Sequence, residues 1–100
     1  MASHTVAKTS EISEGGCKSV NVDGEAIALF NVEGKFYATE DTCKHRGGSL
    51  GDGTLDKKII TCPLHGWTYD VTNGSCETNA DEKLNTYPVT VEGESIIIEK

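Results

Sequence analysis

The chain contains two similar boxes, Cys43-Lys44-His45-Arg46-Gly47-Gly48 and Cys62-Pro63-Leu64-His65-Gly66-Trp67, each with one cysteine and one histidine. Their combined spacing is C-x-H-x16-C-x-x-H. One residue separates the pair in the first box and two separate it in the second, so a single loop turn can direct both side chains toward a common centre. Two such loops, brought together, supply two thiolates and two imidazoles.

This Cys2His2 set fits two kinds of metal centre. A zinc site binds four nitrogen or sulfur ligands in a tetrahedron, but its sequence usually keeps the two cysteines together and the two histidines together. In a Rieske centre, two cysteines hold one iron of a [2Fe-2S] cluster and two histidines hold the other. A cluster is longer than one ion, so each loop must reach both irons, which a cysteine and a histidine in each loop allow. The mixed boxes favour the cluster, and zinc is the alternative.

The spacing and the neighbouring glycines resemble the Rieske family, and within it the small ferredoxins that feed electrons to ring-hydroxylating dioxygenases. The resemblance extends to Tyr87-Pro88-Val89 near the end of the chain, but only the two boxes are specific. It implies one [2Fe-2S] cluster per chain and a Rieske fold in which residues 42–70 form a cluster-binding subdomain at one end. The implied ligands are Cys43, His45, Cys62 and His65.

Length and charge indicate one acidic domain. A chain of 100 residues forms a single domain, residues 1–100, and we expect a monomer. A net charge of −7 at pH 7 disfavours nucleic acid and anionic membrane surfaces, and it favours docking on basic patches of other proteins. No apolar run could span a bilayer, and residues 1–10 lack the apolar core of an export signal. We therefore expect a cytoplasmic protein.

The pattern of apolar residues predicts an all-β fold. Short alternating runs are separated by Asp23-Gly24 and Glu33-Gly34, pairs that tolerate a positive φ in tight hairpins. No stretch has a convincing period of 3.6, and residues 10–14 form at most one helical turn. We expect small antiparallel sheets packed as a sandwich or a partly open barrel, with Pro88 at an edge or bulge. The expected strands are residues 4–8, 18–22, 25–32, 35–39, 57–61, 67–71, 84–91 and 95–99.

The resemblance also bears on the reduction potential. High-potential respiratory relatives carry an extra cysteine in each box, which together form a disulfide, and a serine two residues after the last ligand. The matching positions here are Gly48, Leu64 and Trp67, which supply neither. Tyr69 either matches the tyrosine whose hydroxyl donates to a cysteine sulfur and raises the potential, or it is a core aromatic. We expect a potential low in the Rieske range of about −150 to +300 mV.

Two cations, Lys44 and Arg46, stand inside the first box of this acidic chain. They could orient the docking of a partner or only offset nearby acid.

A Rieske oxygenase also needs a mononuclear iron held by two histidines and a carboxylate, but only His4 lies outside the boxes. No dinucleotide fingerprint is found either. We therefore expect no enzyme but a one-electron carrier between a flavin-containing reductase and a terminal oxygenase.

Two other functions stay open: a small subunit of a nitrite-reductase-type enzyme, which shares the fold, and a zinc-stabilised interaction module with no redox role.

Cys17 and Cys76 lie outside the boxes, and we expect free thiols, although the sequence alone allows a bridge between them. Residues 77–83 are polar and lack proline, whereas many relatives cover the cluster with a Gly-Pro-rich loop. The sequence therefore does not decide whether residues 77–83 cover the cluster.

Overall fold

The computed structural model describes residues 2–42, 49–63, 66–77 and 81–100. Within these ranges the chain forms short β-strands and two single turns of 3-10 helix, η1 (Thr9–Glu11) and η2 (Leu50–Asp52). The all-β expectation is confirmed, and η1 overlaps the helical turn expected at residues 10–14. The strands are β1 (Ser3–Lys8), β2 (Cys17–Val22), β3 (Glu25–Val32), β4 (Lys35–Glu40), β5 (Thr54–Asp56), β6 (Ile59–Thr61), β7 (Thr68–Asp70), β8 (Thr86–Tyr87), β9 (Val89–Glu92) and β10 (Ser95–Glu99).

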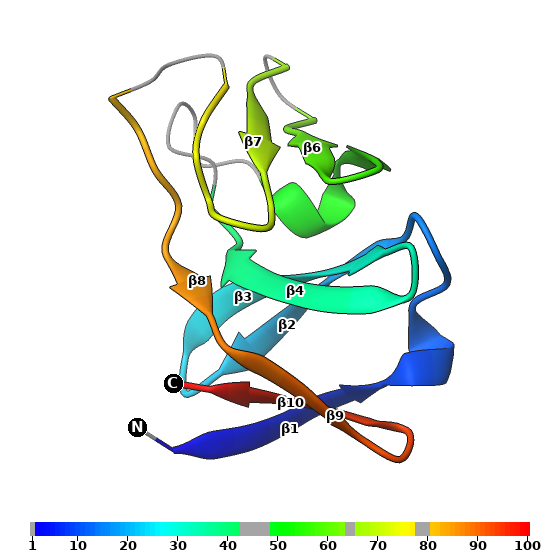
Figure 1. Cartoon of the computed structure of the whole chain (residues 1–100). Helices are drawn as coiled ribbons and strands as arrows, with labels where there is room; N and C mark the ends of the chain where they lie inside the picture. Colours follow the sequence, from blue (N-terminus) through cyan, green and yellow to red (C-terminus); the bar gives the residue numbers. More distant parts are fainter. Residues whose placement is uncertain (1, 43–48, 64–65, 78–80) are drawn as a thin grey trace.

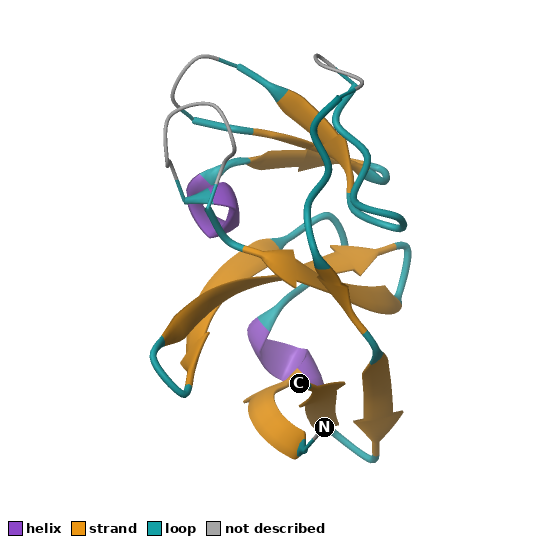
Figure 2. Ribbon diagram, turned by 90° about the vertical axis from the view of Figure 1, so that its left-hand side faces the viewer, coloured by secondary structure: helices purple, strands orange, loops and turns teal. Residues whose placement is uncertain are grey.

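The strands form three antiparallel sheets that lie one above another (Figures 1 and 2). The middle sheet has the order β2-β3-β4-β8, the terminal sheet β1-β10-β9 and the small sheet β5-β6-β7. Figure 1 shows the small sheet above the middle sheet and the terminal sheet below it. We call the middle and terminal sheets together the base. Ala2 and Lys100 exchange two backbone hydrogen bonds of 2.8 and 2.9 Å, so both ends of the described chain lie together in the base.

Strand β3 links two separate cores because both of its faces are buried. Successive side chains of a strand point to opposite faces. Ala28 and Phe30 therefore belong to an upper core, on the side of the small sheet, while Ile27 and Leu29 belong to a lower core within the base. The upper core consists of Ala28, Phe30, Leu50, Ile60, Cys62, Tyr69, Val71, Cys76 and Leu84, and the lower core of Ala7, Ile12, Val22, Ile27, Leu29, Ala38, Ile96 and Ile98.

The meander expected over residues 18–39 is confirmed. Strand β2 pairs with β3, and β3 pairs with β4, each across a two-residue turn. Both turns are left-handed at both positions, with φ of 52° and 84° at Asp23 and Gly24 and of 54° and 90° at Glu33 and Gly34. This conformation matches the right-handed twist of the flanking strands.

The segment 84–91, expected as one strand, is divided at Pro88. Strand β8 pairs with β4 at the edge of the middle sheet, whereas β9 pairs with β10 at the edge of the terminal sheet. Proline has no N–H to donate to a ladder, so it fits between two edge strands. The expected edge position is confirmed, but the single long strand was wrong, because the segment passes from one sheet to another.

The small sheet differs from the sequence expectation in one strand. The expected hairpin of β6 and β7 is confirmed. However, β6 begins only at Ile59, because Lys57 and Lys58 form a turn in which Lys57 has a φ of 56°. This turn pairs β6 with β5, a strand that the sequence analysis did not include. Two lysines are not a usual turn pair, so the sequence signal for this hairpin is weak.

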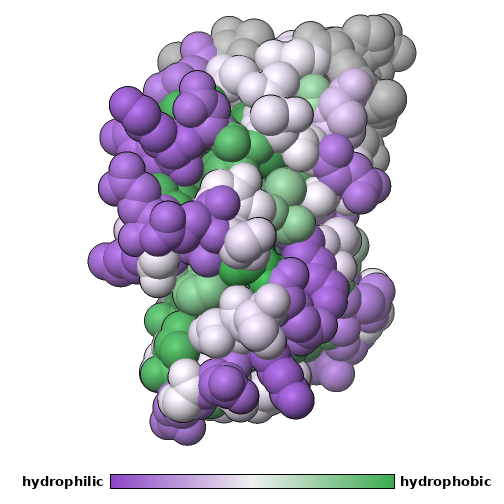
Figure 3. All heavy atoms as spheres, turned by 90° about the vertical axis from the view of Figure 1, so that its right-hand side faces the viewer, coloured by the Kyte–Doolittle hydropathy of each residue, from purple (hydrophilic) through white to green (hydrophobic). Residues whose placement is uncertain are grey.

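The surface of the described residues is largely polar. On the face that Figure 3 shows, apolar side chains gather in separate patches between hydrophilic ones. Val91, which is 44% exposed, is the one large apolar side chain that stands out to solvent among the described residues. The described part of the chain also contains no helix with the length and apolar character needed to cross a membrane.

Candidate metal centre

The structure describes three of the ten residues that the sequence singles out for the site, namely Cys62, Trp67 and Tyr69. The other seven lie outside the described residues: Cys43, Lys44, His45, Arg46, Gly48, Leu64 and His65. The geometry of the site is therefore given by the segments that carry the two boxes.

The second box is carried by the β6–β7 hairpin. Strand β6 ends at Thr61 and β7 begins at Thr68. Just beyond both strands, the backbone N–H of Cys62 donates to the carbonyl oxygen of Trp67 at 2.8 Å. Cys62 is only 2% exposed and belongs to the upper core, against which the half-buried Trp67 packs. The hairpin thus places the Cys62 side chain in the interior, at the base of its loop.

The first box lies between Thr42 and Ser49, which form an antiparallel bridge. Beside this bridge, the backbone N–H of Leu50 donates to the carbonyl oxygen of Asp41 at 2.8 Å. The residues that lead into the first box and those that lead out of it are therefore bonded to each other. We call residues 41, 42 and 49–51 the entry frame.

The side chain of Asp41 strengthens the entry frame. Its carboxylate is buried, with 5% of the residue exposed. One oxygen accepts hydrogen bonds from the hydroxyls of Ser49 and Ser19 at 2.7 and 3.1 Å. The other accepts from the backbone N–H of Gly51 at 2.7 Å. The carboxylate therefore holds β2 and the outgoing residues of the first box at one point.

The supports of the two boxes are joined directly. Thr54, which follows the entry frame, pairs with Thr61, which precedes Cys62. Gly53 lies so close to β6 that a Cβ atom on it would stand 2.2 Å from the carbonyl oxygen of Thr61. Leu50 and Cys62 share the upper core. The two boxes, separated by thirteen residues in the sequence, therefore leave the described fold next to each other, as a shared centre requires.

Tyr69 lies in the same core as Cys62. Its side chain is fully buried, and its backbone in β7 pairs with Ile60 of the neighbouring strand β6. Every buried side-chain oxygen and nitrogen of the described residues has a hydrogen-bond partner, so the Tyr69 hydroxyl is bonded within the interior. The burial agrees with a core aromatic, and a bond to a cysteine sulfur stays a prediction.

Cys17 supports the entry frame from β2. Its thiol donates to the carbonyl oxygen of Gly51 at 3.4 Å and is in no disulfide, so the bridge to Cys76 that the sequence left open is not formed. Burial raises the pKa of the Cys17 thiol, and the charges of Asp52 and Asp41 raise it further. At neutral pH the thiol is therefore protonated and a poor nucleophile.

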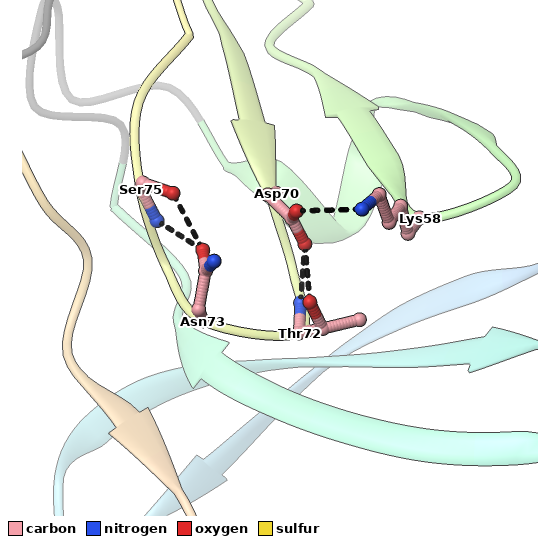
Figure 4. A network of polar contacts seen from close by, with 5 residues as sticks. All are labelled: Lys58, Asp70, Thr72, Asn73 and Ser75. Carbon is pink, nitrogen blue, oxygen red and sulfur yellow. Dashed lines mark hydrogen bonds and ion pairs between the residues drawn. The ribbon is translucent and has the colours of Figure 1, made fainter.

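A second buried carboxylate, Asp70, lies at the opposite end of the β6–β7 hairpin (Figure 4). One oxygen accepts from the N–H and the hydroxyl of Thr72 at 2.9 and 2.6 Å, and the other pairs with Lys58 at 3.3 Å. Burial acts to raise the pKa of Asp70, but the bonds from Thr72 and Lys58 outweigh it and hold the pKa below its ordinary value. In the same turn Asn73 accepts from Ser75. This network fixes the turn that follows β7.

Sequence analysis missed two residues that shape the supports of the boxes, Asp41 and Gly53, and it also missed the buried Asp70 at the far end of the hairpin. Asp41 follows β4, Gly53 precedes β5 and Asp70 ends β7, and aspartate and glycine are common at such positions for many reasons. The only signal that could have drawn attention to Asp41 is its place two residues before Cys43. Nothing in the sequence separates it from the other turn residues.

The described residues fit a cluster with mixed ligands. Cys62 supplies a buried sulfur, which is the donor that iron in such clusters binds as thiolate. The joined supports bring the ends of the two boxes to one place, so each box can contribute its cysteine and its histidine to the same group.

Residues 2–88 match the model of the Rieske [2Fe-2S] domain family. The chain therefore belongs to this family, and its cofactor is a Rieske [2Fe-2S] cluster rather than a zinc ion.

Known proteins similar to this chain include small ferredoxins. The ferredoxin component of the naphthalene 1,2-dioxygenase system of Pseudomonas aeruginosa is 39% identical over 90 residues, covering 89% of this chain and 86% of that protein. A structure from a complex of reduced oxygenase and oxidized ferredoxin in carbazole 1,9a-dioxygenase matches with a TM-score of 0.89 at 34% identity, covering 96% of this chain and 91% of that one. The Sphingomonas yanoikuyae B1 ferredoxin matches with a TM-score of 0.91 at 29% identity over 99% of both chains.

A protein described as the small subunit of a nitrite reductase matches with a TM-score of 0.85, but at 18% identity it shows the fold alone. The ferredoxins are similar in sequence as well as in fold, and they carry electrons without catalysing a reaction themselves. This chain is accordingly an electron-transfer protein of the ferredoxin type and not an enzyme.

Proposed function

We propose that this protein passes single electrons from a flavin-containing reductase to the terminal oxygenase of a ring-hydroxylating dioxygenase system, as a monomer in the cytoplasm. The observation that carries the proposal is the similarity, over almost the whole chain, to ferredoxins named as components of dioxygenase systems. The net charge of −7 supports it, because long-range charge speeds the encounter of small carriers with oppositely charged partners.

The cluster is bound by the thiolates of Cys43 and Cys62 and by the imidazoles of His45 and His65. The joined supports of the two boxes and the buried position of Cys62 favour this ligand set. When bound, the cluster takes up and releases one electron, and histidine ligation gives it a higher potential than four thiolates would. The upper core shields the Cys62 sulfur from water, while the entry frame fixes where the first box begins and ends.

The ligand set is tested by electron paramagnetic resonance (EPR) of the dithionite-reduced protein, together with its iron content. We expect a rhombic signal with the low average g value of a mixed-ligand centre, and two irons per chain. Cys62→Ala should abolish both, whereas Cys17→Ser, which removes a cysteine outside the boxes and keeps a donor to Gly51, should keep them. A colourless protein with one zinc ion would contradict the proposal.

The reduction potential lies in the lower part of the Rieske range, which spans about −150 to +300 mV. Gly48, Leu64 and Trp67 provide neither a disulfide nor a hydroxyl at the positions where high-potential relatives have them. Tyr69 belongs to the same core as Cys62, and a hydroxyl that donates to a ligand sulfur favours the reduced state.

A redox titration tests this proposal. Tyr69→Phe should lower the potential, because it removes a donor and keeps the buried ring. Trp67→Ser should raise it, since it introduces a hydroxyl at the position of the respiratory serine. A wild-type potential near the top of the range would contradict the argument, and so would a Tyr69→Phe protein with an unchanged potential.

Docking is oriented by Lys44 and Arg46. Residues 42–70 carry four lysines or arginines against three aspartates, which is a net charge of +1. Because the whole chain has a net charge of −7, the remaining residues together carry −8. A molecule with this polarity is turned by the field of its partner before contact. The partner surface should therefore place acidic residues opposite these two cations, within the basic surroundings that suit the net charge of −7.

Stopped-flow reduction by the reductase at several salt concentrations tests the role of the two cations. Lys44→Glu and Arg46→Glu should slow reduction and change its salt dependence. Lys8→Glu makes the same charge change at the exposed last residue of β1 in the base and should have a smaller effect. Unchanged rates in the first two variants would rule out docking by these side chains.

A further inference from the structure

The entry frame contains a buried negative charge whose purpose the cluster chemistry does not explain. Asp41 directly follows β4 and is 5% exposed. In the part of the chain that the structure describes, its carboxylate is held by two serine hydroxyls and one backbone N–H rather than by a lysine or an arginine. A buried charge is costly unless such donors satisfy it, so its presence here calls for a function.

The contacts of Asp41 reach both ends of the first box. Its backbone carbonyl accepts from Leu50, and its carboxylate accepts from Ser49 and Gly51, all of which follow the box. Asp41 itself precedes the box by one residue, Thr42. One residue therefore fixes the distance between the start and the end of the segment that contains Cys43 and His45.

The frame is also held against the base. Ser19 of β2 donates to the Asp41 carboxylate, and a Cβ atom on Gly51 would stand 2.6 Å from the backbone nitrogen of Ser19. Gly51 thus allows an approach to β2 that no other residue could make without a shift. The entry frame cannot move relative to β2 without breaking these contacts.

We propose that Asp41 is a positioning residue of the cluster site, which sets the orientation of the first ligand box through Ser49 and Gly51. The proposal rests on the assignment of Cys43 and His45 as ligands under the proposed function. Residues that orient metal ligands by hydrogen bonding tune both the affinity for the metal and its redox properties. Asp41 acts indirectly, because it bonds to the residues that flank the box and not to the ligands themselves.

Asp70 offers a matched control within the same hairpin sheet. It is also an aspartate that is almost fully buried, with 6% exposed, and it also accepts from a hydroxyl, that of Thr72, at 2.6 Å. However, it lies at the end of the β6–β7 hairpin away from Cys62. A merely structural role would give the two carboxylates similar effects on the cluster.

The test compares Ser49→Ala with Thr72→Ala in the cluster-loaded full chain. Each variant removes one hydroxyl that donates to a buried aspartate, and neither changes the net charge. Both should lower the urea midpoint of unfolding. We expect Ser49→Ala alone to change the EPR g values and the reduction potential, and to speed iron release to a chelator by about tenfold, whereas Thr72→Ala should match the wild type in all three.

Asp41→Asn and Asp41→Ala extend the test to the carboxylate itself. Asparagine keeps the size and one acceptor, so it should partly restore the g values that Asp41→Ala changes. Should Asp41→Ala fail to fold, Ser49→Ala still decides. The proposal is overturned if Ser49→Ala keeps wild-type g values, potential and iron release, or if Thr72→Ala changes them equally. Failure of the ligand assignment is distinguishable, because Cys43→Ala would then keep the EPR signal that the loss of a first-box ligand should abolish.

Discussion

The upper and lower cores lie on opposite faces of one strand, but they are built from different residues. The buried residues of the lower core are all alanine, valine, isoleucine or leucine, and the strands that contribute them have five to eight residues. The upper core includes Phe30, Tyr69 and two cysteines, and the small sheet above it has strands of three residues each. Such short strands do not form a stable sheet alone. The base therefore supports the small sheet, which depends on it for stability and carries the second box.

The largest expected effect comes from Gly53→Ala in the small sheet. The new Cβ atom would stand 2.2 Å from the carbonyl oxygen of Thr61, and because that atom belongs to the backbone, the pairing of β5 with β6 must shift. We expect a loss of more than about 3 kcal/mol in the free energy of unfolding and almost no bound iron. Iron per chain and thermal unfolding measure the two effects.

Gly93→Ala is the matched change in the base. Gly93 has a φ of 61° but open space around the position of a Cβ atom, so alanine should cost about 1 kcal/mol and leave the iron content unchanged. A Gly53→Ala protein with a normal iron content would show that the small sheet tolerates more movement than its contacts indicate.

Next in size are Leu50→Ala in the upper core and Ile98→Ala in the lower core. Both side chains are fully buried, so each truncation should cost about 2 to 5 kcal/mol in the free energy of unfolding. Only Leu50 packs in the core that contains Cys62, and only Leu50→Ala should speed iron release. Urea unfolding and iron transfer to a chelator separate the two. Equal rates of iron release would mean that the two cores are not distinct in function.

The sequence predicted the part of this contrast that depends on regular patterns. Alternation of apolar residues and the Asp23-Gly24 turn were enough to place the meander of the base. Residues that tolerate a positive φ, flanked by apolar residues at every second position, are compatible with few structures other than a tight hairpin. The boxes identified the family through their cysteines and histidines, the spacing between them and the neighbouring glycines. The Lys57-Lys58 turn was not predictable, since lysine has no preference for a left-handed conformation and only the pairing of β5 with β6 holds it there.

The roles of Asp41 and Asp70 were equally hidden. Their partners Ser19 and Lys58 lie 22 and 12 residues away in the sequence, so no local pattern connects them. Pro88 stands between these cases. Its chemistry predicted an edge, but only the fold shows that two different sheets meet there.

A smaller effect is expected from Asp70→Asn, and it should depend on pH. The pKa of Asp70 in the folded chain lies below its ordinary value. Its carboxylate therefore stabilises the fold above the unfolded pKa of about 3.9, and this contribution is lost as the pH falls through the lower folded pKa. We expect Asp70→Asn to cost about 1 to 2 kcal/mol at pH 7 and the gap to the wild type to narrow below pH 4.

Urea unfolding of both proteins between pH 7 and pH 3 checks this. In the base, Glu25→Gln is the counterpart, because the bond from Tyr87 and then the one from Lys100 lower the pKa of Glu25. Glu25 is more exposed to solvent than Asp70, so its variant should change the acid dependence less. An Asp70→Asn gap that stays constant with pH would contradict the assignment.

The smallest effect, and one of opposite sign, is expected from Lys57→Gly. A left-handed lysine is strained, whereas glycine adopts this conformation freely. After the greater entropy of the unfolded glycine chain is subtracted, we expect a gain of about 0.5 kcal/mol in the free energy of unfolding. Glu33→Gly, at a φ of 54° in the base, should gain about as much. Thermal unfolding measures both, and a clear loss in Lys57→Gly alone would mean that the lysine side chain supports the small sheet.

The hydrogen bonds between Ala2 and Lys100 bring the ends of the described chain together in the terminal sheet, while the small sheet, which carries the second box, lies on the other side of the middle sheet. A tether at either end would therefore leave the cluster end open. A fusion to a reductase or to an electrode anchor through residue 2 or residue 100 should preserve electron transfer. The same closeness would let the whole unit be inserted into a loop of another protein, as a portable redox module.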